Sequence, residues 1–263
     1  MTVADSDPAE GSPPSCPNCG GRKVAAYCAD CGQRQGEEVL SVRYWLREFA
    51  DAWLSLDGRV LRSVRALLVR PGFLTLQWHR GRRAGYSRPL FLCLWAGIIL
   101  VAMVLLVARA DMAIQAGPRE MGTDLAFRVV PLALLAAVPA LAQVVNLIQW
   151  SDARSYVEHL VFATHLQAFL LLAMVPVIVQ AEMEVLPPPW DVILYTAAMG
   201  YVAWYMVAAF RNVYGGGWPG ATGKAALLGF VGYGIVVPVV TGLIMAALLL
   251  AAVGVSSLLG LAD

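Results

Sequence analysis

The sequence predicts an all-α polytopic membrane protein of about five transmembrane helices, preceded by a small cysteine module and amphipathic interfacial helices. Two observations lead to this prediction. Of the 263 residues, 59% are hydrophobic and only 14% are charged, whereas globular domains carry about 25% charged residues. Long apolar runs follow residue 88, and four of the five cysteines stand before residue 32. Lipid is therefore expected to be the main solvent of this chain.

The N-terminal region divides into a leader and a cysteine module. Residues 1–14 are acidic, contain Pro and Ser and have no apolar core, so a disordered leader is expected in place of a signal peptide. Two Cys-x-x-Cys pairs, separated by eight residues, follow it: Cys16, Cys19, Cys28 and Cys31. Tight turns at this spacing can direct four thiolates at one ion, which predicts a zinc ribbon over residues 15–36.

The expected cofactor of this ribbon is one structural Zn²⁺. Four sulfur ligands close the coordination shell and leave no position for a substrate, which excludes a catalytic role for the metal. Two disulfides, free thiols or a rubredoxin-like iron site are the alternatives. The spacing favours a metal in a reducing, cytoplasmic setting. Between the two pairs, residues 23–27 are long enough for one short strand.

A basic amphipathic region is expected over residues 39–88. It contains ten basic and three acidic residues, a net charge of +7. Apolar residues at helical spacing predict two short helices, at 42–56 and 60–68, which we expect to lie among lipid headgroups. Packing on each other or on a partner subunit is the alternative. The arginines directly before the first span are expected to contact anionic headgroups: Arg80, Arg82, Arg83 and Arg88.

Five segments of residues 89–263 are near or above the roughly 20 residues that a bilayer requires. They are 89–108, 129–149, 157–180, 192–210 and 225–253. Pro139 and Pro176 are expected to kink the second and third spans, and Pro238 to tilt or break the last. The basic residues before the first span and the absence of Lys and Arg from loop 182–191 predict a cytoplasmic N-terminus and an outside C-terminus.

Several motifs resemble known bacterial sequences. The Cys-Pro-x-Cys-Gly and Tyr-Cys-x-x-Cys-Gly-Gln pairs resemble short bacterial zinc ribbons. Residues 67–72, 80–83, 86–90 and 156–162 resemble a bacterial membrane family known only as a domain of unknown function, in which a ribbon precedes a Pro-Gly…Gly-Lys-Arg…Tyr…Pro stretch. Arg82 stands where Lys is common. The resemblance implies the architecture and a bacterial origin, and it implies no activity.

Polar residues in the second and third spans form a candidate intramembrane cluster. The two segments are antiparallel neighbours if the connection between them is short, which places these residues at similar depth: Gln143, Asn146, His159 and His165. A proton or solute path is the functional interpretation, and bundle packing is the structural one. Glu158 follows Ser155 in a capping-box pattern and is expected at a helix start.

The leading hypothesis is a non-enzymatic inner-membrane docking or scaffold protein whose ribbon binds a cytoplasmic protein. A homo-oligomeric transporter or channel that uses the polar cluster is the first alternative. A lipid-active enzyme with His159 or His165 as base is the second, but no nucleophile or acidic cluster accompanies these histidines. Nucleic-acid binding is not expected, because the ribbon itself carries only Arg22, Lys23 and Arg34.

Overall fold

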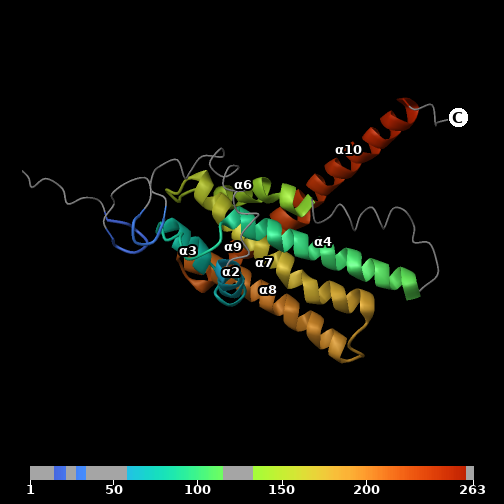
Figure 1. The fold of residues 1–263 in the computed structure, drawn as a ribbon, viewed down its shortest axis with the longest axis horizontal. Coiled ribbons are helices and arrows are strands. Elements are labelled where there is room, and N and C mark those ends of the chain that lie inside the picture. The colour runs from blue at the N-terminus through green and yellow to red at the C-terminus, as the bar shows by residue number, and fades with distance from the viewer. Residues whose placement is uncertain (1–14, 22–27, 34–57, 115–132, 259–263) are drawn as a thin grey trace, which may run out of the picture.

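The computed structural model describes residues 15–21, 28–33, 58–114 and 133–258 (Figure 1). The expected all-α membrane fold is confirmed, since the regular elements in these residues are helices. The leader, the strand expected at 23–27 and the helix expected at 42–56 lie outside them. The helices in chain order are α2 (Gly58–Val69), α3 (Phe73–His79), α4 (Pro89–Ile114), α6 (Val138–Ile148), α7 (Tyr156–Met183), α8 (Trp190–Tyr214), α9 (Trp218–Leu227), the π-helix η2 (Leu228–Val236) and α10 (Val237–Leu258).

Four stretches of the described chain are long and apolar enough to cross a membrane: Pro89–Leu106, Tyr156–Ala181, Trp190–Tyr214 and Trp218–Leu248. The second expected span, 129–149, is described from residue 133. A helical turn at 133–136 is followed by a turn at Ala137 and then by α6, whose 11 residues alone extend about 16 Å. Helical hydrogen bonds continue across Ala137, since its N–H donates to Ala133 O and the Leu141 N–H donates to Ala137 O, both at 2.8 Å. Pro139 stands in the first turn of α6, directly after this interruption, and the expected kink stays a prediction.

The directions of the long helices show where α6 lies along the path of the chain. The neighbouring helices α4 and α7 both run away from the cysteine module, and α8 runs back toward it (Figure 1). The chain must therefore return toward the module between α4 and α7, and α6 belongs to this return. The end of α6 is fixed near the start of the last long helix, because Lys224 Nζ donates to Gln149 Oε1 at 2.7 Å.

The centre of the bundle is α7, which packs against α4, α6 and α8. Its capping box is present as expected, with the Ser155 N–H donating to Glu158 Oε2 at 2.8 Å. Phe162 and Phe169 are fully buried, and Phe169 stacks on Tyr205 of α8 at 3.5 Å between ring centroids. Aromatic packing along one side of α7 therefore joins it to α8. Pro176 lies within α7, as the sequence indicates.

The last helix changes its winding ahead of Pro238. Residues Leu228–Val236 form the π-helix η2, and α10 begins at Val237. Pro238 has no N–H to donate to the carbonyl four residues earlier, so the preceding turn can widen at low cost. The glycines there allow close packing: a Cβ on Gly232 would lie 2.8 Å from Leu141 Cδ2 of α6.

Helix α2 and the short α3 meet at an elbow, residues 70–72, that packs against α8. Gly72 has φ 73°, and a Cβ there would lie 2.8 Å from Val213 Cγ2. The last carbonyls of α2 lack partners within the helix, and tyrosines of α8 donate to them: Tyr205 to Leu67 O at 2.6 Å and Tyr201 to Leu68 O. The amphipathic helix predicted at 60–68 is thus α2, whereas α3 was not predicted.

Candidate metal centre

The two cysteine pairs fold into turns with the same backbone pattern. The N–H of Gly20 donates to Cys16 O at 2.8 Å, and that of Gly32 donates to Cys28 O at 2.9 Å. The two glycines have φ of 77° and 68°, a conformation that a residue with a Cβ adopts at a cost. The sequence signal, a glycine directly after each Cys-x-x-Cys pair, is therefore explained by the turn geometry.

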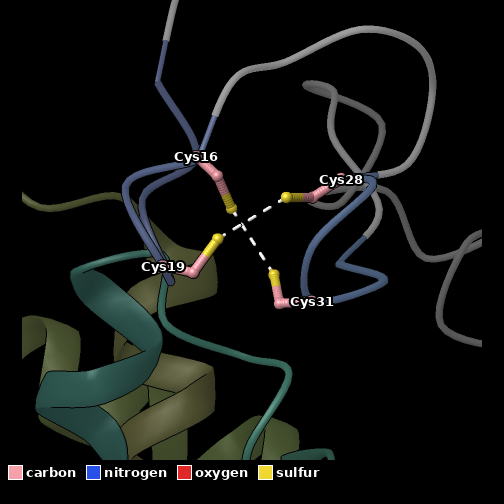
Figure 2. A group of neighbouring side chains, drawn as sticks. All are labelled: Cys16, Cys19, Cys28 and Cys31. Carbon is pink, nitrogen blue, oxygen red and sulfur yellow. Dashed lines mark hydrogen bonds between the residues drawn. The ribbon is translucent and has the colours of Figure 1, made fainter.

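The four sulfurs point toward a common centre (Figure 2). The Sγ–Sγ distances are 3.7 Å for Cys16–Cys31 and 3.5 Å for Cys19–Cys28, and all four atoms lie within 4.8 Å of one another. Four thiolates at about 2.3 Å from one tetrahedral ion are about 3.8 Å apart, so the observed spacing fits such an ion. A disulfide needs about 2.05 Å, and all four cysteines are free.

The environment of the sulfurs differs across the site. Cys16 and Cys28 are 2% exposed, whereas Cys19 faces solvent. The N–H of Gly21 donates to Cys19 Sγ at 3.4 Å and lowers the pKa of that thiol, but its neighbouring thiols outweigh this effect and raise the pKa to about 12. The Cys19 thiol therefore resists ionisation beside its neighbours, and a bound cation would favour its thiolate. The four cysteines can bind one metal ion.

The module is attached to the membrane bundle through Gln33, which directly follows the second turn. Its side chain is buried, and Nε2 donates to Gly81 O at 2.6 Å. Its Oε1 accepts from the backbone N–H groups of Arg83 at 3.0 Å and Ala84 at 3.2 Å. The backbone carbonyl of Gln33 accepts from Cys28 N at 2.8 Å. One residue therefore links a metal-binding turn to the loop between α3 and α4.

The first turn contacts the same loop through Pro17. A Cβ on Gly81 would lie 3.2 Å from Pro17 Cβ and Cγ, and Gly81 has φ 72°. The absence of a side chain therefore allows both the loop conformation and the close approach of the proline. Beyond this contact, the guanidinium of Arg83 lies 4.1 Å above the Trp78 ring.

The loop arginines predicted to contact lipid have different environments. Arg80 and Arg82 are exposed, whereas Arg83 and Arg88 are partly buried. Arg82, Arg83 and Arg88 line a recess of about 20 Å³, which His165 also lines and which has room for about one water molecule. A lipid contact of these arginines stays a prediction.

The residues of the predicted intramembrane polar cluster contact different partners instead of one another. His159 Nδ1 is 2.9 Å from the Tyr214 hydroxyl of α8, and His165 Nδ1 is 3.0 Å from the Thr75 hydroxyl of α3. Gln143 is exposed and Asn146 is half-buried. Within the described chain, no hydrogen bond joins these two amides to either histidine. The histidines instead connect α7 to α8 and to α3, and their use in a proton or solute path stays a prediction.

One segment of the chain, which begins after the cysteine module and ends within the first long helix, matches a known protein family. Residues 57–101 match the family described as Protein of unknown function (DUF3667). The expected resemblance to a family of unknown function is thus confirmed over this DUF3667 segment, which contains α2, α3, the following loop and the first half of α4. No curated protein and no solved structure matches the chain.

The DUF3667 segment is where three parts of the structure meet. Its loop binds Gln33 of the cysteine module. At its elbow, Pro71 O accepts a hydrogen bond from Asn212 of α8 at 3.0 Å. Its Thr75 is hydrogen-bonded to His165 of α7. Neither Gln33 nor Thr75 was predicted as a contact residue. A glutamine directly after Cys-x-x-Cys-Gly was the available signal for the first, and no pattern marked the second.

Proposed function

We propose that the protein is a non-enzymatic docking protein of the bacterial inner membrane, in which a zinc ribbon binds a cytoplasmic protein at the membrane surface. The observation that carries this proposal is the contact of Gln33 with the loop at 81–84. A ribbon joined only by a flexible tether would present a partner at no fixed place. A ribbon held by three hydrogen bonds presents one face at a defined position beside the bundle.

Zn²⁺ is the metal that best fits this role. Thiolate ligands in a tetrahedral set favour zinc, and a closed shell of four sulfurs supports a structural function. So small a module buries too little apolar surface to fold alone, so metal binding would supply most of its folding free energy. Loading with zinc would therefore decide whether the docking surface exists.

The charge distribution supports an orientation with the ribbon in the cytoplasm. Thirteen of the nineteen Lys and Arg residues lie between Arg22 and Arg88, on the ribbon side of the first long helix. Positive residues are retained on the cytoplasmic side of bacterial membranes. Since α4 leaves the ribbon side and the chain crosses an odd number of times under this proposal, the C-terminus lies outside.

The test is photo-crosslinking in intact cells from the ribbon surface. A photoreactive residue replaces Ala29, which is exposed between Cys28 and Cys31, and in a matched control it replaces Trp150, which is 83% exposed beside the bundle. We expect a discrete protein adduct from position 29 that disappears when Cys28→Ser is added, and no such adduct from position 150. The same adduct from both positions, or an adduct from position 29 that persists with Cys28→Ser, would refute docking through the folded ribbon.

A further inference from the structure

A pocket with three arginines lies on α2, away from the cysteine module's contact with the loop at 81–84. Its volume is about 310 Å³. It is lined by Arg62, Arg65, Ala66, Val69, Arg70 and Tyr86. Ligand pockets in proteins begin at about 300 Å³, so this one is large enough for a small polar group.

The three arginines that line the pocket come from α2 and the residue directly after it. Arg62 and Arg65 are three residues apart and so lie on the same face of α2, and Arg70 follows the end of the helix. Arg62 Nη1 makes one long contact, 3.5 Å, with Gly85 O, and Arg70 lies 5.4 Å above the Phe73 ring. Within the described part of the chain, none of these three arginines forms an ion pair, whereas Arg154 pairs with Asp152. The pocket arginines therefore keep hydrogen-bond donors for an anion.

The side chains that line the pocket favour a phosphate group as its ligand. Guanidinium groups present pairs of N–H donors whose spacing matches two oxygens of a phosphate or carboxylate. Three such groups around one volume suit a group with several anionic or polar oxygens, and the Tyr86 ring adds an apolar wall. A single carboxylate would use only one of the three.

The location of the pocket selects a lipid as the source of the phosphate. The Ser87 N–H donates to Ser63 Oγ of α2 at 2.7 Å, two residues before α4 and its membrane-spanning stretch begin. Helix α2 lies crosswise to the long helices at this end of the bundle (Figure 1). Leu61 is 75% and Val69 is 64% exposed beside the arginines, so apolar surface is available for the glycerol and upper acyl chain.

We propose that Arg62, Arg65 and Arg70 bind the phosphate-bearing headgroup of an anionic phospholipid in this pocket. The site differs from the general attraction of a basic surface to a membrane, because it has a defined volume and would hold about one lipid per chain. It also goes beyond the proposed function and does not depend on it. Bound lipid would stabilise α2 and its elbow against α8 at the level of the headgroups.

The experiment measures lipid retained by the full-length protein. The protein is purified in detergent, supplied with phosphatidylglycerol or phosphatidylcholine, and examined by native mass spectrometry. Wild type is expected to retain one phosphatidylglycerol at concentrations at which phosphatidylcholine is lost. The double variant Arg62→Gln/Arg65→Gln should weaken this retention by about tenfold or more, because each arginine near a headgroup contributes to anionic-lipid affinity.

The matched control is Arg59→Gln/Arg211→Gln, which removes the same charge from two exposed arginines that do not line the pocket. It should retain phosphatidylglycerol within about twofold of wild type. Circular dichroism and gel filtration check that both variants fold, and Arg65→Lys, which keeps the charge but loses the paired donors, should bind with intermediate affinity. Glycerol phosphate and inorganic phosphate are added as soluble competitors.

Three outcomes overturn the proposal. If the pocket variant and wild type retain the same amount of phosphatidylglycerol, these arginines do not form the site. If the control variant loses as much lipid as the pocket variant, total charge and not the pocket decides retention. If glycerol phosphate binds as tightly as phosphatidylglycerol, the ligand is a soluble phosphate compound. Adding Cys16→Ser should leave lipid retention unchanged, which separates this site from docking through the ribbon.

Discussion

The substitution Gln33→Ala tests whether the metal-binding turns and the bundle form one cooperative structure. It removes the donor to Gly81 O at 2.6 Å and the acceptor of the Arg83 and Ala84 N–H groups. A neutral hydrogen bond contributes about 0.5–1.5 kcal/mol net, so three of them contribute about 2–4 kcal/mol to attachment. If the module folds only with metal, this energy also contributes to metal affinity.

The expected result is therefore a weaker metal site, although Gln33→Ala changes none of the four cysteines. A loss of about 2–4 kcal/mol corresponds to an apparent zinc affinity about 30- to 1000-fold lower. The assay is competition for zinc between the purified full-length protein and a chromophoric chelator. The control variant is Asn18→Ala, because the Asn18 amide lies in the first turn and makes no hydrogen bond to the bundle in the described structure. Equal zinc affinity of wild type and Gln33→Ala would refute the coupling and leave a module that binds metal without help from the bundle.

Three further predictions concern the metal, the topology and the bundle. Elemental analysis should find about one zinc per chain, lost when any of the four ribbon cysteines becomes Ser; a wild-type preparation with neither zinc nor iron would contradict this. A C-terminal alkaline phosphatase fusion should be active and an N-terminal one inactive, whereas an inactive C-terminal fusion would indicate an even number of crossings. Thr75→Val should lower the stability of the bundle by about 1–3 kcal/mol in thermal unfolding, because it leaves buried His165 Nδ1 without its partner, and Thr196→Val on an exposed surface should change stability little.

The sequence was most informative where a pattern has one physical cause. Cys-x-x-Cys-Gly repeated at short separation predicts two turns because thiolate geometry and the positive φ of Gly20 and Gly32 leave few other backbones. The apolar runs after residue 88 predict long helices because backbone polar groups must be satisfied inside lipid. These interactions are local or depend on solvent, so they can be identified without knowledge of distant contacts.

The second expected span shows where such patterns are insufficient. Hydropathy over 129–149 meets the length requirement, yet the described helix is interrupted at Ala137, two residues before Pro139. A window of mean hydropathy does not register such an interruption. The direction of the chain still requires a return between α4 and α7, and that requirement became visible only from the arrangement of the long helices (Figure 1).

The sequence by itself determined which segments are apolar enough for a lipid environment and which four cysteines can bind a metal. It also determined that residues 39–88 are basic. The tertiary structure decided which side chains contact one another. Gln33 joins the cysteine module to the loop at 81–84, and Thr75 is hydrogen-bonded to His165. Arg62 and Arg65 line one pocket with Arg70. The contacts of Gln33 with the loop and of Thr75 with His165 join residues 48 to 90 positions apart, and no periodicity or motif connects them. Only the packing of α2 and α3 on α7 and α8 brings them together, because the burial of helix faces fixes positions that sequence spacing does not specify.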